Sequence, residues 1–71
     1  MPSKDEISKA KHHTLIYWKR KLLWEMKKCL WKEWCAETSD EEYLRIITEE
    51  IPAIRKCLNW IDDRLNELVP T

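Results

Sequence analysis

Apolar residues recur alternately three and four positions apart from Leu44 to Leu68, and this spacing constrains the fold more than any other feature of the 71-residue chain. The repeat fills the a and d positions of about three and a half heptads, which is typical of a helix that packs along a second helix. We therefore expect an all-α protein with a long helix over about residues 40–69. Its predicted core positions are Leu44, Ile47, Ile51, Ile54, Leu58, Ile61, Leu65 and Leu68.

Pro52 interrupts this predicted helix, because proline lacks the backbone N–H and its ring crowds the carbonyl group four residues earlier. The heptad pattern keeps its phase on both sides of Pro52, which favours one helix with a kink at that residue. The alternative is a three-helix bundle in which Pro52 lies in the first turn of a third helix. A weaker apolar stripe beside the predicted core consists of Ile46, Ala53, Cys57 and Trp60.

A first helix is predicted over about residues 4–37, after a capping-box pattern formed by Ser3 and Glu6. Read at 3.6 residues per turn, it carries two apolar stripes. The wide stripe spans close to half of the circumference, which is more than one neighbouring helix can cover. It contains Leu15, Ile16, Trp18, Leu22, Leu23, Met26, Cys29, Leu30 and Trp34, and the narrow stripe contains Tyr17, Trp24 and Trp31.

The two predicted helices meet at residues 38–39, where Ser39 and Glu42 form a second capping-box pattern. A short turn makes the two helices antiparallel neighbours. The expected architecture is therefore a helical hairpin that forms a single domain over residues 1–71. The second helix is therefore expected to cover only one edge of the wide stripe, with Leu23 beside Ile54, Leu30 beside Ile47 and Trp34 beside Leu44.

The apolar surface that this hairpin leaves uncovered is the main indication of function. Large uncovered apolar surfaces mark interfaces, and tryptophan and tyrosine are common anchors in them. We expect a non-enzymatic interaction or regulatory protein that acts through helix–helix contacts and forms a homo-oligomer, most simply a dimer arranged as a four-helix bundle. The predicted interface residues are Leu15, Tyr17, Trp18, Leu22, Trp24 and Trp31.

The net charge is zero, but the charges are divided between the two halves of the chain. Residues 1–32 contain nine Lys or Arg against three acids, and residues 33–71 contain four against ten. Opposed charges of this kind suit two helices packed side by side. The alternative function is a nucleic-acid-binding module, because cations and stacking aromatic rings lie together on the first helix, and a basic helix of this kind also suits a membrane surface. The candidate nucleic-acid contacts are Arg20, Lys21, Lys27 and Lys28.

No catalytic, metal-binding or nucleotide-binding motif is present, so we expect neither enzyme activity nor a metal or other cofactor. The three cysteines form no C-x-x-C pair and fall at different heights of the hairpin, which predicts free thiols. His12 and His13 are adjacent, so their side chains diverge on a helix and are expected to be exposed. The longest uncharged apolar run is far too short to span a membrane, and the charged N-terminus lacks a signal-peptide core, so a cytoplasmic location is expected.

The C-terminal part of the second helix resembles the BH3 motif of Bcl-2-family ligands. Ile54, Leu58, Ile61 and Leu65 match the four apolar positions of that motif, and Asp63 matches its aspartate. Asp62 departs from the motif, which has a small residue at that point. The resemblance covers about 13 residues and implies a further alternative function, that of a helical ligand for the groove of a Bcl-2-family protein.

Overall fold

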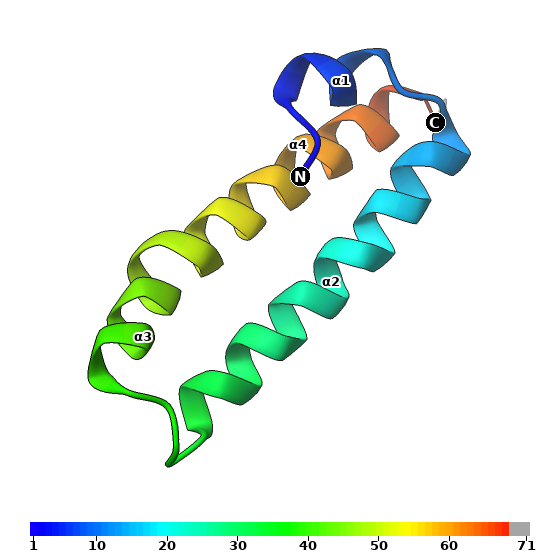
Figure 1. Cartoon of the computed structure of the whole chain (residues 1–71). Coiled ribbons are helices and arrows are strands. Elements are labelled where there is room, and N and C mark those ends of the chain that lie inside the picture. The colour runs from blue at the N-terminus through cyan, green and yellow to red at the C-terminus, as the bar shows by residue number, and fades with distance from the viewer. Residues whose placement is uncertain (69–71) are drawn as a thin grey trace.

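The computed structural model describes residues 1–68 and has the form of an elongated helical hairpin of 45 × 18 × 17 Å (Figure 1). The longest helix runs antiparallel to a second rod that consists of three consecutive helical segments, and a short N-terminal helix folds back onto that rod. The described residues contain helices and no strands, which confirms the predicted all-α class. The elements are α1 (Lys4–Lys9), α2 (His12–Trp34), α3 (Asp40–Arg45), the π-helical turn η1 (Ile46–Glu50) and α4 (Ile51–Leu68).

Both predicted helix starts are confirmed. The Ser3 hydroxyl accepts a hydrogen bond from the Glu6 amide at 3.2 Å, and the Glu6 carboxylate accepts one from the Ser3 amide at 3.2 Å. The Ser39 hydroxyl accepts a hydrogen bond from the Glu42 amide at 3.2 Å and so caps α3. The predicted end of the last helix near Val69 lies outside the described residues.

The predicted helix over residues 4–37 begins where expected, but it is broken after Lys9 and it ends earlier than predicted. Ala10 adopts an extended conformation and separates α1 from α2, so that Ile7 packs against α4 and is almost fully buried. Because Lys19 pairs with Asp62, a straight helix would carry Ile7, twelve residues before Lys19, beyond Leu68, the described end of α4. At the other end α2 stops at Trp34, and the Thr38 hydroxyl donates a hydrogen bond to the Lys32 carbonyl at 2.7 Å.

Pro52 is accommodated by the π-helical turn that precedes it. The backbone remains right-handed helical from α3 through η1 into α4, so the rod is not broken at Pro52. The Ile51 amide donates to the carbonyl of Ile46, five residues earlier, which adds one residue to that turn. The Thr48 hydroxyl supplies a hydrogen bond to the Leu44 carbonyl at 2.6 Å. The strain expected at proline is therefore absorbed by a wider turn.

The π-helical turn changes which residues reach the core. In a regular α-helix, residues five apart lie about 140° apart around the axis. The wider turn instead places Ile46 and Ile51 on the same side, and both are buried. Leu44, before the turn, is exposed and Ile47, within it, is half-buried, so the predicted heptad core fails up to the turn and holds after it. Ile54 and Ile61 are buried as predicted.

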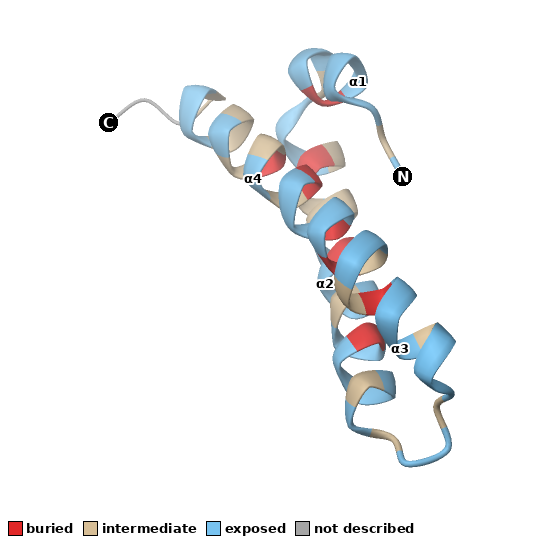
Figure 2. Ribbon diagram, turned by 90° about the vertical axis from the view of Figure 1, so that its left-hand side faces the viewer, coloured by how far each residue is buried: buried red, intermediate tan, exposed pale blue. Residues whose placement is uncertain are grey.

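The antiparallel pairing of the two rods is confirmed by contacts at three heights. Lys32 pairs with Glu42 near the connecting turn at 3.5 Å, and Lys19 pairs with Asp62 near the open end at 2.8 Å. Between them the Cys29 thiol contacts the Glu50 carboxylate. The buried positions lie on the inner sides of the helices from the open end of the hairpin to Cys29 and Ile46, and α3 contains none (Figure 2). They are Ile7, Leu15, Leu22, Cys29, Ile46, Ile51, Ile54, Cys57 and Ile61.

Candidate interaction surface

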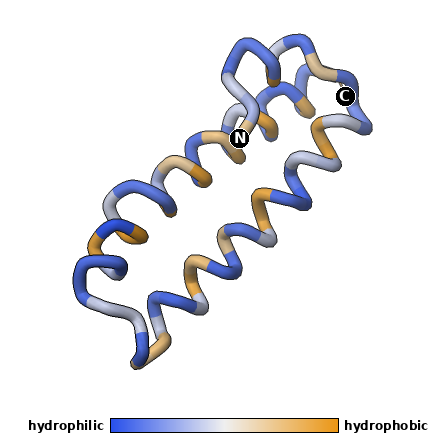
Figure 3. Tube along the Cα trace, viewed as in Figure 1, coloured by the Kyte–Doolittle hydropathy of each residue, from blue (hydrophilic) through white to orange (hydrophobic). Residues whose placement is uncertain are grey.

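One side of α2 carries large apolar side chains that no described segment of the chain covers. At about 100° per residue they span an arc of about 140°, and from Tyr17 to Trp34 they extend along about 26 Å of helix. Trp31 and Trp34 are the most open, with exposed fractions of 75% and 86%. Apolar positions recur along the entire length of α2 (Figure 3). The outer face, as we call this surface, consists of Tyr17, Leu23, Trp24, Leu30, Trp31 and Trp34.

Three of the six predicted interface residues belong to the outer face, namely Tyr17, Trp24 and Trp31. The prediction that Leu15 and Leu22 remain uncovered is wrong, because both are buried against α4 in the core of the chain itself. Trp18 is half-buried and packs at the edge of this core.

The other half of the outer face was missed by sequence reasoning. Leu23, Leu30 and Trp34 were assigned to the contact with the second helix, yet all three are exposed. The reason is that α2 has two apolar rows with the same spacing, and the sequence does not indicate which of them faces α4. Leu15, Leu22 and Cys29 are spaced seven apart, and so are Ile16, Leu23 and Leu30, so either row satisfies the heptad pattern. The structure uses the first row for the core.

The tryptophans enclose a shallow hollow near the end of α2. It has a volume of about 580 Å³, and its walls are almost entirely apolar. It is bordered by three lysines as well as by apolar side chains. The lining residues are Trp24, Lys27, Lys28, Leu30, Trp31, Lys32 and Trp34.

Cations lie within and beside the outer face. The Lys21 ammonium lies 5.1 Å from the centre of the Tyr17 ring, and the Lys27 ammonium lies 5.7 Å from the centre of the Trp24 ring. These distances permit cation–π attraction, worth about 0.5–1 kcal/mol at an exposed site. Within residues 1–68, Arg20, Lys21 and Lys27 form no ion pair with a carboxylate. The fourth candidate nucleic-acid contact, Lys28, pairs with Glu25 at 3.6 Å.

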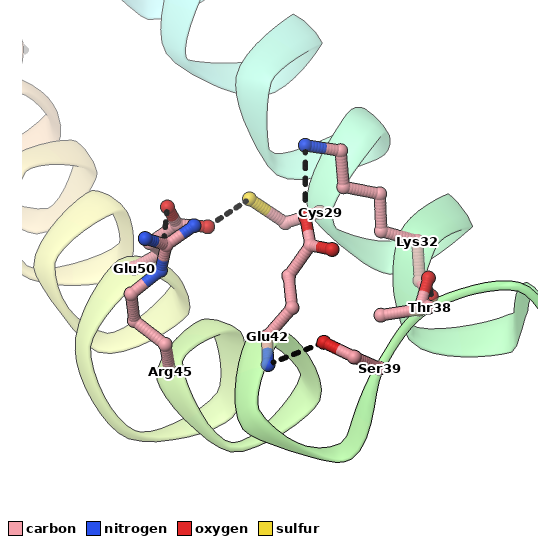
Figure 4. A network of polar contacts seen from close by, with 7 residues as sticks. All are labelled: Cys29, Lys32, Thr38, Ser39, Glu42, Arg45 and Glu50. Atoms are coloured by element: carbon pink, nitrogen blue, oxygen red, sulfur yellow. Dashed lines mark hydrogen bonds and ion pairs between the residues drawn. The ribbon is translucent and has the colours of Figure 1, made fainter.

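A polar network joins the two rods close to the connecting turn (Figure 4). The Cys29 thiol donates to the Glu50 carboxylate at 3.7 Å, and Arg45 approaches the same carboxylate at 3.9 Å. Burial, reinforced by the negative charge of Glu50, raises the pKa of the Cys29 thiol. Burial likewise raises the pKa of the Cys57 thiol, which donates to the Pro2 carbonyl. Both thiols are therefore held in the protonated, unreactive form.

We expect Cys35 to be alkylated first when the folded protein is treated with iodoacetamide near pH 8. All three cysteines are free thiols, but Cys35 is half-buried whereas Cys29 and Cys57 are buried. The raised pKa of the Cys29 and Cys57 thiols also lowers the fraction of each that is reactive thiolate. Mass spectrometry of tryptic peptides against time measures the three rates, and the same reaction in urea, where the rates should converge, is the control. Equal rates for Cys57 and Cys35 in the folded protein would contradict the packing of α1 on α4.

The residues that resemble a BH3 motif are engaged within the fold. Ile54 and Ile61 are buried in the core, and Leu58 and Leu65 are half-buried against it. A BH3 ligand presents these apolar positions to its receptor, so such a contact would require α4 to separate from α2.

Among residues 1–68, no three His, Cys, Asp or Glu side chains are grouped so that they would hold a metal ion. His12 and His13 are exposed, as predicted. In the same range no helix combines the length and the apolar character needed to cross a bilayer. Comparison of the chain with protein-family models, with curated proteins and with solved structures gives no match.

Proposed function

We propose that this chain is a small, non-enzymatic interaction protein that binds a helix of another polypeptide along the outer face of α2. The exposure of six large apolar side chains on one helix face is the observation that carries the proposal. Tyr17, Trp24 and Trp31 form one row with seven-residue spacing, and Leu23 and Leu30 form a second. Rows with this spacing provide the holes into which a partner helix inserts its side chains.

The energetics support the same proposal. Burying a large apolar side chain that is otherwise exposed is worth about 1.5–3 kcal/mol, although ordering and association costs consume part of this in a complex. Tryptophan and tyrosine are also the residue types most often found as dominant contacts in interfaces. The inner side of α2 already forms the core with α4, so a partner on the outer face would not have to displace any of residues 1–68.

The four-helix-bundle dimer expected from the sequence, and its cytoplasmic location, stay predictions. The dimer was predicted with Leu15 and Leu22 among its uncovered residues, and both are buried within one chain. Leu23, Leu30 and Trp34 are exposed in their place, so apolar surface still remains for a partner, although different residues form it.

Photo-crosslinking in the cells that naturally produce the chain tests the proposal. A photoreactive amino acid is placed at Trp31, on the outer face, or at Asn59, which is exposed on α4. We expect a discrete protein adduct from position 31, with the crosslinked segment mapping to a helix of the partner, and no such adduct from position 59. A second substitution, Trp24→Glu, should remove the adduct without unfolding the chain, because Trp24 is exposed. Equal adducts from both positions, or adducts that survive Trp24→Glu, would contradict the proposal.

A second candidate function, nucleic-acid binding, is favoured by the three cations without carboxylate partners beside exposed aromatic rings. If the chain binds single-stranded nucleic acid, the logarithm of the association constant should fall with the logarithm of salt concentration with a slope of about −2, because Arg20, Lys21 and Lys27 together neutralise about three phosphates. Fluorescence anisotropy of a labelled oligonucleotide measures this slope. Tight binding with a slope near zero would contradict the electrostatic explanation. Lys11→Glu, which removes a cation remote from the outer face, is the control and should leave the slope unchanged.

A further inference from the structure

We infer that the partner on the outer face is an acidic amphipathic helix of a different polypeptide, and this inference rests on the function proposed above. Charge on α2 is its first support. Helix α2 contains six Lys or Arg against two Glu, whereas residues 40–68 contain eight acids against four Lys or Arg. Two copies that meet through their outer faces would bring two strongly basic helices together. An acidic partner helix has the complementary charge.

The position of the cations within the face is the second support. Arg20 and Lys27 are seven residues apart and project between the leucine row and the aromatic row, on the arc that a partner helix would cover. Neither has a carboxylate partner among the described residues. Covering a cation removes its water, and this is unfavourable unless the partner supplies an opposite charge. A helix that buries the leucines and tryptophans must therefore bring carboxylates to Arg20 and Lys27.

The apolar part of the face favours a protein over a nucleic acid. Leu23 and Leu30 form a continuous row beside the cations, and the hollow between Leu30, Trp31 and Trp34 has apolar walls. Leucine side chains offer neither a charge for phosphate nor an aromatic ring for base stacking. They are suited to contact with the apolar stripe of another helix.

Titration with three synthetic peptides tests the inference. Each peptide has three heptads with leucine at the a and d positions, and glutamate, lysine or glutamine at the e and g positions. None contains tryptophan, so the emission of the protein's own tryptophans reports binding. We expect the glutamate peptide to bind at least tenfold more tightly than the lysine peptide, and the difference to shrink as salt is raised.

Charge-reversal variants locate the effect. Arg20→Glu combined with Lys27→Glu should weaken binding of the glutamate peptide roughly tenfold and strengthen binding of the lysine peptide. The matched control, Lys11→Glu combined with Arg55→Glu, makes the same change in net charge at exposed positions away from the outer face and should change the affinity by about twofold or less. Circular dichroism checks that all variants remain helical.

The outcomes separate the inference from the function on which it rests. Equal binding of all three peptides, lost in Trp24→Glu, would overturn the acidic preference and leave the proposed function standing. Failure of every peptide to bind would count against both. A dimer seen by light scattering that dissociates in Trp31→Glu, or an oligonucleotide that displaces the glutamate peptide, would assign the face to a second copy or to nucleic acid and overturn the inference.

Discussion

Leu22→Ala is expected to lower the free energy of unfolding by about 2–5 kcal/mol, whereas Leu23→Ala should change it by about 0.5 kcal/mol or less. The two leucines are neighbours on the same helix, and the substitution is the same. Leu22 is 6% exposed and packs in the core, so its truncation leaves a cavity between α2 and α4. Leu23 is 48% exposed on the outer face, where water fills the space that is left.

Urea unfolding followed by circular dichroism measures both values on one scale, with the wild type in the same buffer. The predicted loss at Leu22 is a large fraction of the stability of a domain of this size. A larger loss at Leu23 than at Leu22 would mean that α2 presents its other leucine row to α4. The leucines of the outer face would then belong to the core, and the proposed function would lose its basis.

Ile46→Ala should also cost about 2–5 kcal/mol, and Leu44→Ala should cost little. Ile46 is fully buried, whereas Leu44 is 56% exposed although it occupies a heptad position in the sequence. The difference arises from the π-helical turn, which rotates the residues before Ile51 relative to those after it. The experiment therefore tests the turn directly.

The same urea titration measures this pair, and Ile54→Ala serves as a reference for a core position that the turn does not affect. Comparable losses at Ile46 and Ile54 are the expected result. If Leu44→Ala were the costly substitution, an uninterrupted α-helix would run through residue 50 and the heptad pattern would hold over its whole length.

The sequence predicted those features that depend on local chemistry. The hydroxyls of Ser3 and Ser39 cap α1 and α3 as expected, because this hydrogen bond joins residues only three positions apart. The reciprocal bond of a capping box is present at Ser3, whereas the Glu42 carboxylate pairs with Lys32 instead. The antiparallel pairing of the helices was predicted from the short connection between them. The heptad spacing predicted that Ile51, Ile54 and Ile61 are buried in the core.

The features that were missed depend on tertiary contacts. Ala10 is a good helix former, and nothing in its neighbourhood signals the break that releases Ile7 to pack on α4. The choice between the rows containing Leu22 and Leu23 depends on which row fits α4, and both rows have the same period. The exposure of Tyr17, Trp24 and Trp31 was therefore predicted correctly, whereas the exposed and the buried leucine rows were exchanged.

The π-helical turn also determines which change in chain length is compatible with the fold. It contains one residue more than an α-helical turn, between Ile46 and Ile51, and both of these are core residues. A sequence that lacked one residue between them would place the same two isoleucines four apart, on one side of a regular α-helix. This segment therefore behaves like an insertion that the helix has absorbed, and a shorter sequence with an ordinary α-helix here would build the same hydrophobic core if another residue replaced Pro52.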